Sequence, residues 1–284
     1  MVACTPHPGL GTVVVRGAQV DLATCLTSKA PPIPASLATV RVTKDSQAIV
    51  FKGKVVLKIH ENHKGFPAGS PGPIELEGVS PDGRWILYAI DPMGSASLAA
   101  DGLTLKAVAV TGGRSYTVES GLMYSSYRTW CNSRTLVVTA GGDRLAAHDK
   151  RLIVTGPPTW KARPLVNEPG RAFGSVVCAP DGKSVLVQEQ PASTNASFFD
   201  FKWRLWRIAM ATGKSTQLTQ PPAGYIDESP AFSPDQSTIY FVRSRKGVGK
   251  LYALRNGKLT GPLLALGYQL GFYGHQDWPY RVTR

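Results

Sequence analysis

The 284-residue chain contains no run of about 18 consecutive apolar residues, the length at which a hydrophobic stretch becomes a candidate membrane span. It also lacks the Gly-x-Ser-x-Gly sequence that forms the nucleophile turn of α/β-hydrolases. No Cys-x-x-Cys pair is present, which removes the usual spacing of cysteine ligands to zinc. The sequence therefore predicts no transmembrane segment, no appended serine-hydrolase domain, no metal site and no cofactor.

The chain does contain a recurring tight-turn motif, and each copy is followed by a short apolar run. The three clear copies are Ser80-Pro81-Asp82-Gly83, Ala179-Pro180-Asp181-Gly182 and Ser233-Pro234-Asp235-Gln236. Proline sets φ at the second turn position, aspartate bonds the nearby backbone, and glycine accepts a positive φ without steric cost. A turn-plus-strand unit that returns about every 40 to 55 residues predicts a stacked or circular array of small sheets.

The spacing of these turns gives the number of units. Asp82 and Asp181 lie 99 residues apart, which is about twice the length of a four-stranded propeller blade. A degenerate copy of the turn, Asn132-Ser133, lies between them, and another degenerate copy, Asp45-Ser46, precedes them. Five units are therefore expected to begin near residues 37, 78, 126, 174 and 228.

The two ends of the chain supply a sixth unit. Residues 8–30 contain strand-like runs without a turn motif, and residues 278–283 form a lone strand candidate. We expect residues 272–284 to complete the N-terminal blade, with 278–283 pairing beside 12–16, because ring closure removes exposed sheet edges. The predicted fold is all-β: one domain, residues 1–284, forming a six-bladed β-propeller of four-stranded antiparallel blades closed by the C-terminal strand.

The Ser-Pro-Asp-Gly turn at residues 80–83, the aromatic-aliphatic strand after it and the count of six units resemble the TolB-type, WD-repeat-like β-propellers of bacteria. The resemblance covers roughly residues 8–284. It implies the propeller architecture and a bacterial source, but it names no partner. TolB itself carries an additional N-terminal α/β domain, for which this chain has no room.

Four cysteines bear on the compartment. Cys4 and Cys25 flank the first hairpin, whereas Cys131 and Cys178 occupy matching places in consecutive units. Because innermost strands of neighbouring blades lie side by side, a Cys131–Cys178 bridge is geometrically reasonable. The even number of cysteines, in register with the repeat, predicts this bridge and Cys4–Cys25, and such bridges indicate an oxidising compartment. The alternative is four buried thiols that act as small hydrophobic side chains. The first residues lack the pattern of a signal peptide, so the protein is either cytosolic or its leader is absent from this chain. The cysteines favour the second alternative, and we expect a periplasmic, secreted or cell-surface protein.

The chain is strongly basic, with a formal net charge of +13. Such a surface suits nucleic acid, anionic lipid or an acidic partner. The positive residues are scattered through hairpin turns, and the densest run, residues 243–250, falls in one hairpin. Solvated turn tips are the simpler explanation, since basic turns also discourage edge pairing. No specific nucleic-acid binding is predicted, and a monomer is expected.

The candidate site lies at the segments that precede innermost strands, because these rim the mouth of a propeller's channel. They gather tyrosine, arginine, histidine and acids, a composition typical of binding hot spots. Ordinary rim residues and aromatics that fill the wedge between blades are the alternative. The candidate partner-binding residues, whose polar groups we expect to be accessible, are Tyr127, Arg128, Tyr225, Asp227, Glu228, His275 and Asp277.

Three functions compete on this sequence. The first is a non-enzymatic, extracytoplasmic propeller that binds a protein or peptide at the channel mouth, with no catalytic residue. The second is a metal-dependent propeller enzyme of the lactonase or lyase type, in which Asp227, Glu228 and Asp277 would contribute ligands. The third is a basic scaffold that associates with an anionic surface.

Overall fold

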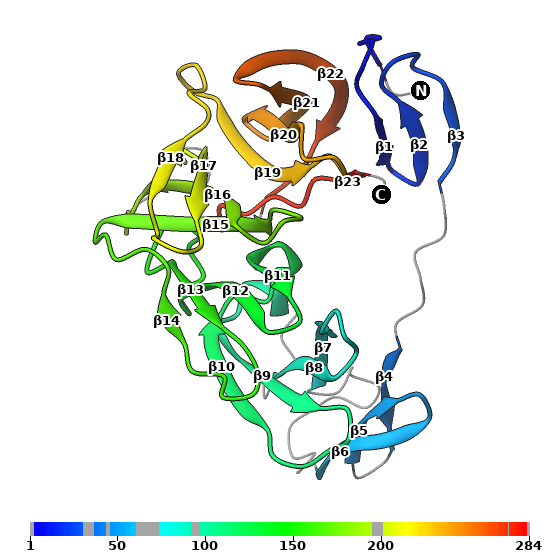
Figure 1. Ribbon diagram of the computed structural model, residues 1–284, viewed down its shortest axis with the longest axis vertical. Helices are drawn as coiled ribbons and strands as arrows, with labels where there is room; N and C mark the ends of the chain where they lie inside the picture. Colours follow the sequence, from blue (N-terminus) through cyan, green and yellow to red (C-terminus); the bar gives the residue numbers. More distant parts are fainter. Residues whose placement is uncertain are drawn as a thin grey trace.

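The computed structural model describes residues 3–30, 37–43, 46–60, 74–91, 97–194, 201–271 and 273–282. Strands dominate, and they form six antiparallel sheets that follow one another in chain order around an incomplete ring, with a wide separation between the first and second sheets (Figure 1). The predicted all-β, six-bladed propeller is confirmed. In the described part of the chain no helix is long and apolar enough to cross a membrane.

Three blades come from the first half of the chain and its last strand. Blade 1 contains β23 (Tyr280–Val282), β1 (Thr12–Val15), β2 (Ala18–Asp21) and β3 (Thr27–Lys29). Blade 2 contains β4 (Ala38–Val42), β5 (Ser46–Phe51) and β6 (Lys54–His60). Blade 3 contains β7 (Ile74–Val79), β8 (Trp85–Ile90), β9 (Leu103–Ala109) and β10 (Tyr116–Gly121), with the 3-10 turn η1 (Leu98–Ala100) between β8 and β9. Residues 61–73, where a fourth strand of blade 2 is expected, lie outside the described residues.

The other three blades follow in chain order. Blade 4 contains β11 (Arg128–Asn132), β12 (Thr135–Ala140), β13 (Arg151–Thr155) and β14 (Arg163–Pro164), and the 3-10 turn η2 (Ser125–Tyr127) precedes it. Blade 5 contains β15 (Arg171–Cys178), β16 (Ser184–Pro191), β17 (Arg204–Ala209) and β18 (Ser215–Gln217). Blade 6 contains β19 (Ile226–Phe232), β20 (Thr238–Arg245), β21 (Val248–Arg255) and β22 (Lys258–Tyr268).

The recurring turn joins the first and second strands of its blade, as predicted. In blade 3 the Ser80 hydroxyl donates to the Asp82 carboxylate over 2.6 Å, and that carboxylate accepts the N–H of Arg84 over 3.1 Å. In the degenerate copy of blade 4, the Asn132 side chain accepts the N–H of Arg134 over 2.8 Å. Asparagine therefore replaces aspartate in the same backbone bond. The degenerate turn of blade 2 contains Asp45, which lies outside the described residues.

The C-terminal strand closes blade 1. β23 pairs antiparallel with β1, so that Val13 faces Val282 and Val15 faces Tyr280. One buried cluster then joins blades 1 and 6, with Val13 and Leu22 on one side and Tyr240 and Leu251 on the other. The predicted closure is confirmed.

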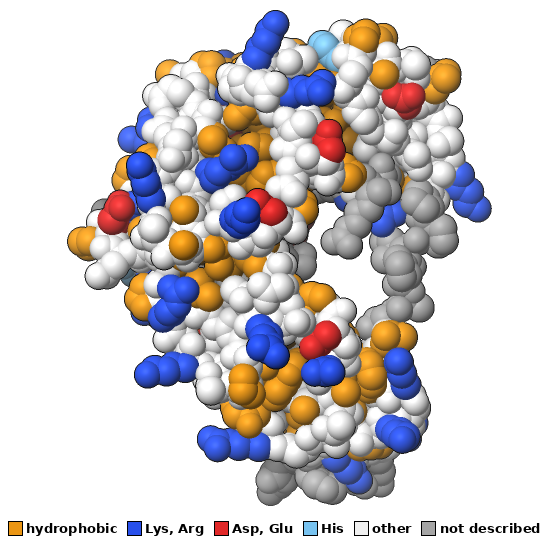
Figure 2. Space-filling model, in the orientation of Figure 1, with side chains coloured by type: hydrophobic (Ala, Val, Ile, Leu, Met, Phe, Trp, Pro, Cys, Tyr) orange, Lys and Arg blue, Asp and Glu red, His pale blue; other side chains and the backbone are white. Residues whose placement is uncertain are grey.

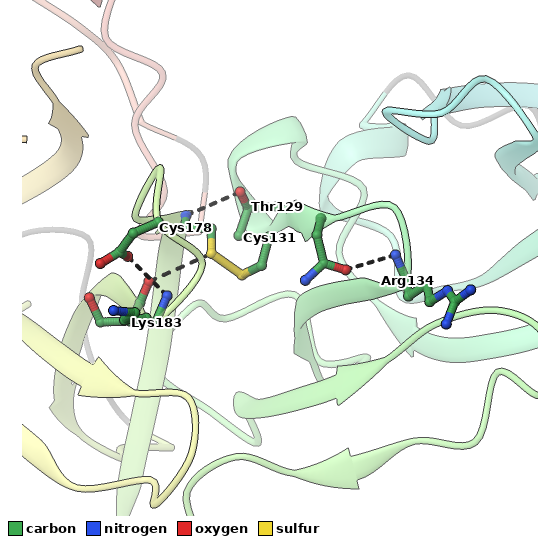
Figure 3. Close-up of a disulfide and its surroundings, with 8 residues drawn as sticks. Thr129, Cys131, Arg134, Cys178 and Lys183 are labelled. Atoms are coloured by element: carbon green, nitrogen blue, oxygen red, sulfur yellow. Dashed lines mark hydrogen bonds between the residues drawn. A yellow bond between two sulfur atoms is a disulfide. The ribbon is translucent and has the colours of Figure 1, made fainter. Parts of the chain in front are cut away.

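Both predicted disulfides are present. Cys131–Cys178 joins β11 of blade 4 to β15 of blade 5, with a Cα–Cα distance of 5.2 Å (Figure 3). Next to it, the N–H of Cys178 donates to the Thr129 hydroxyl over 3.2 Å. Cys4–Cys25 ties the N-terminal segment to the β2–β3 turn, with a Cα–Cα distance of 5.8 Å. Each bridge therefore joins two segments that do not pair with each other as neighbouring strands of one sheet.

Candidate binding site at the channel mouth

Three segments that lead into innermost strands meet at one end of the ring, which we call the channel mouth. The imidazole of His275 lies edge-on to the ring of Tyr127, with centroids 5.1 Å apart. Burial raises the pKa of Tyr127, and the nearby charges of Asp277 and Glu228 raise it further. The segments are residues 124–128 before β11, residues 225–228 at the start of β19 and residues 273–278 before β23.

The segment before β23 crosses this end of the ring instead of passing directly from blade 6 to blade 1. The N–H of Ala146, in blade 4, donates to the carbonyl of Tyr273 over 2.8 Å. The indole N–H of Trp203, in blade 5, donates to the carbonyl of Gly274 over 3.3 Å. Figure 1 shows the same path, with the red segment running from β22 towards blade 5 before it returns to β23. The chain's own residues 273–278 therefore line the channel mouth.

His275 is held between tyrosine rings inside this crossing segment. Its imidazole stacks on Tyr124, with centroids 3.8 Å apart and planes 28° from parallel. Nε2 lies 2.9 Å from Asp277 Oδ1 and 3.5 Å from Ser126 Oγ. A nucleophilic serine and an orienting aspartate bond opposite nitrogens of the ring, whereas both groups here approach Nε2. The arrangement fixes the imidazole and Asp277 but does not activate Ser126.

Asp277 carries an exposed, ionised carboxylate. Its side chain is 74% exposed, while that of His275 is 4% exposed. The hydrogen bond with His275 lowers the pKa of Asp277 and outweighs the opposing effect of its partial burial. A charged group is therefore presented to solvent by a buried and well-packed neighbour.

The two acids of β19 are buried and have different partners. Asp227 accepts two hydrogen bonds from the Arg243 guanidinium, over 2.7 and 2.8 Å. Glu228 is 1% exposed and accepts a 2.6 Å hydrogen bond from the Ser244 hydroxyl. Burial raises the pKa of Glu228 to about 7. Adjacent positions on a strand point to opposite faces of the sheet, and this separates an ion-paired acid from one that takes up a proton near neutral pH.

Arg128 is buried against blade 3. Its guanidinium forms an ion pair with Glu77 of blade 3, and the two side chains are 9% and 7% exposed. It also donates to the carbonyl of Glu77 over 3.1 Å and to that of Tyr124 over 3.3 Å. Burial lowers the pKa of Arg128 to about 10. Arg128 thus joins blade 4 to blade 3.

The expected accessibility of all seven side chains is not observed. Tyr225 and Asp277 are exposed, whereas the side chains of the remaining five are buried. Those five are Tyr127, Arg128, Asp227, Glu228 and His275. For Arg128, Asp227 and Glu228 the physical reason is that the first side chains of an innermost strand pack against neighbouring strands. Tyr127 and His275 are buried against each other where the crossing segment covers the mouth.

One contact at the mouth was not predicted from the sequence. Arg144, in the loop between β12 and β13, forms an ion pair with Asp101 of blade 3. Its guanidinium also lies over the ring of Tyr273, 5.7 Å from the centroid. Arg144 precedes an outer strand, β13. The search of the sequence considered only segments that precede innermost strands, so it did not include Arg144. Among the described residues, no group of three or more His, Cys, Asp or Glu side chains is placed to hold a metal ion.

The comparisons with known proteins bear on the fold. No protein-family model matches the chain, and no curated protein matches it. Among solved structures, the putative TolB from Agrobacterium tumefaciens is 13% identical, covers 96% of this chain and 98% of its own, and has a TM-score of 0.53. TolB from Acinetobacter baumannii is 15% identical, with 89% and 62% covered and a TM-score of 0.48. An oligogalacturonate lyase in complex with manganese is 13% identical, with 89% and 70% covered and a TM-score of 0.49. At these identities the likeness concerns the fold alone.

Proposed function

We propose that this TolB-like β-propeller is a non-enzymatic protein that binds a protein or peptide partner at its channel mouth. The observation that carries the proposal is the exposed carboxylate of Asp277, fixed by the buried imidazole of His275. A polar group that is already held in position loses little conformational entropy when a partner binds it. The proposed site comprises Tyr127, Arg128, Tyr225, Asp227, Glu228, His275 and Asp277.

These residues have two roles in the proposal. Tyr225 and Asp277 contact the partner, because their side chains are exposed. The five buried side chains hold the strand starts and the crossing segment in place. Exposed tyrosine side chains are common in binding hot spots.

The proposed location is extracytoplasmic. Two disulfides support it, because structural disulfides persist in oxidising compartments and are rare in the bacterial cytosol. Alkylation of intact cells followed by mass spectrometry tests this proposal: in the native compartment Cys131 and Cys178 should resist alkylation until a reductant is added. Free thiols at these positions would contradict it.

The binding proposal is tested by capture from a bacterial envelope extract, followed by affinity measurement with the partner identified. We expect Tyr225→Ala with Asp277→Ala to weaken binding by about tenfold or more. The matched control is Leu259→Ala with Arg84→Ala. Both side chains are exposed and lie near turns at the end of the ring opposite the channel mouth. Equal affinity of the two double variants for the partner would contradict the proposed site.

A further inference from the structure

A cationic surface lies at the seam between blades 5 and 6, beside the channel mouth. Two pockets of about 490 and 430 Å³ meet there and share Pro222 and Tyr225. Lys202 and Arg204 line the first pocket. The second is lined by Arg243, Arg245 and Lys250, and none of the described residues that line either pocket is acidic. We call these two pockets the seam site.

The alternation of side chains along blade 6 explains why these cations gather. On β20, Tyr240 and Val242 pack into the buried cluster shared with blade 1. Arg243 and Arg245 therefore point to the opposite face, where they line a pocket with residues of the loop before β19. On β21 the same alternation buries Leu251 and directs Lys250 to the seam. One face of the blade is apolar, and its other face at the mouth end is basic.

The positive charge of the seam site is largely unpaired. Asp227 is fully buried, and both of its oxygens are engaged by Arg243. In the part of the chain that the structure describes, the other four cations form no ion pair; they are Lys202, Arg204, Arg245 and Lys250. Basic side chains spread over the face shown in Figure 2, but at this seam they line a concave surface. Cations of one sign held around a pocket repel one another, and a bound anion relieves that repulsion.

The aromatic rings of the seam site help to distinguish an acidic peptide from single-stranded nucleic acid as the bound anion. The Arg245 guanidinium lies 5.5 Å from the Tyr225 ring centroid, and that of Arg243 lies 5.2 Å from the Tyr252 centroid. Both rings therefore already have a cation over a face. Bases of single-stranded nucleic acid stack on open aromatic faces, so this arrangement disfavours them. The planar guanidinium matches both carboxylate and phosphate groups, and within this chain Arg243 already binds a carboxylate, that of Asp227.

We propose that the seam site binds an acidic segment of a partner protein, with glutamate or aspartate side chains entering the two pockets. Two adjoining pockets suit an extended peptide, whose side chains enter separate pockets while its backbone spans Tyr225. Lys202, Arg245 and Lys250, the exposed cations, receive the carboxylates. The seam site shares Tyr225 with the proposed mouth site, but among the described residues none of its cations forms a hydrogen bond or ion pair with His275 or Asp277. A test on Arg245 and Lys250 therefore leaves the contacts around His275 unchanged.

The test uses the full chain and a fluorescein-labelled hexaglutamate peptide, with binding followed by anisotropy at about 50 mM and 150 mM salt. We expect saturable binding that weakens with salt, and an affinity loss of about tenfold or more for Arg245→Glu with Lys250→Glu. The control is Arg84→Glu with Lys183→Glu, which makes the same change in net charge at turns remote from the seam and should alter affinity by less than about twofold. If the charge reversal prevents folding, Arg245→Ala with Lys250→Ala replaces it.

Three results would overturn the proposal. The first is a similar loss of affinity in the seam and control variants, which would mean that the peptide senses net charge alone. The second is the absence of saturable binding by the wild-type protein at the lower salt concentration. The third is tighter binding of a six-nucleotide thymidine oligomer than of hexaglutamate, with the same dependence on Arg245 and Lys250.

Discussion

His275 stacks on Tyr124, with ring centroids 3.8 Å apart. The two residues are distant in sequence: Tyr124 follows the last strand of blade 3, and His275 precedes the strand that closes blade 1. This contact therefore ties the crossing segment to the far side of the ring. It makes the channel mouth part of the folded core as well as a candidate binding surface.

A double-mutant cycle measures that contact. His275→Ala and Tyr124→Ala should each lower the free energy of unfolding, and the two changes should be coupled by about 0.5–1.5 kcal/mol, as expected for an aromatic pair. Chemical denaturation of the four proteins gives the coupling. A cycle of His275→Ala with Tyr116→Ala is the control, because Tyr116 packs against Trp85. Coupling of the same size in both cycles would contradict a specific contact.

The buried carboxylate of Glu228 should make stability depend on pH. Its pKa is raised from 4.5 to about 7 in the folded protein, so the folded state binds a proton that the unfolded state has released. The resulting stabilisation is complete below pH 4.5 and is lost as the pH rises through about 7. Glu228→Gln keeps an oxygen for Ser244 and removes the titration. Relative to wild type, its unfolding free energy should gain about 2–3 kcal/mol between those limits.

The measurement is a set of urea denaturation curves at several pH values for both proteins. Glu168→Gln serves as the control, because that side chain is 59% exposed and its replacement should leave the difference from wild type nearly constant. A pH-independent difference between Glu228→Gln and wild type would show that Glu228 ionises at its ordinary pKa.

The Arg128–Glu77 pair gives a prediction about the contact between blades 3 and 4. Arg128→Ala would leave the Glu77 carboxylate buried without its cation, and breaking a buried pair in this way costs about 3–5 kcal/mol. Replacing both residues, with Arg128→Met and Glu77→Leu, should cost much less, because no uncompensated charge is left. Thermal and urea denaturation compare the two. A single variant as stable as the double variant would contradict the burial of this pair.

The fold could be predicted because its information is local. Pro81 and Asp82 encode a turn whose bonds involve residues only a few positions away, and the degenerate copy at Asn132 preserves the same backbone bond. The length of the repeat then gave the number of blades. Closure followed from counting incomplete units, and β23 pairs with β1 as that count required.

The candidate site was predicted less completely because exposure depends on non-local packing. Tyr127 and His275 were both selected because they precede an innermost strand, and their rings are in contact in the structure. The same rule could not show that residues 273–278 cross the ring, since that path depends on contacts of Tyr273 with Ala146 and of Gly274 with Trp203. Nor could it show the seam site, which arises from two loops and two strands that converge only in the folded protein.

Ring closure itself can be tested by removing β23 while the crossing segment is kept. Deletion of residues 279–284 removes the antiparallel partners of Val13 and Val15 and exposes the edge of β1. It also removes Tyr280, whose hydroxyl donates to the carbonyl of Ser229 in blade 6. Blade 1 then keeps the buried cluster that it shares with blade 6 but loses its sheet pairing with the C-terminal strand, so we expect a lower Tm and a broad or multistep transition by calorimetry. Tyr280→Phe, which keeps the strand and loses one hydrogen bond, should lower stability by about 1 kcal/mol and leave a single transition. A truncated chain that melts sharply at the wild-type temperature would mean that the β1–β23 pairing does not hold the ring together.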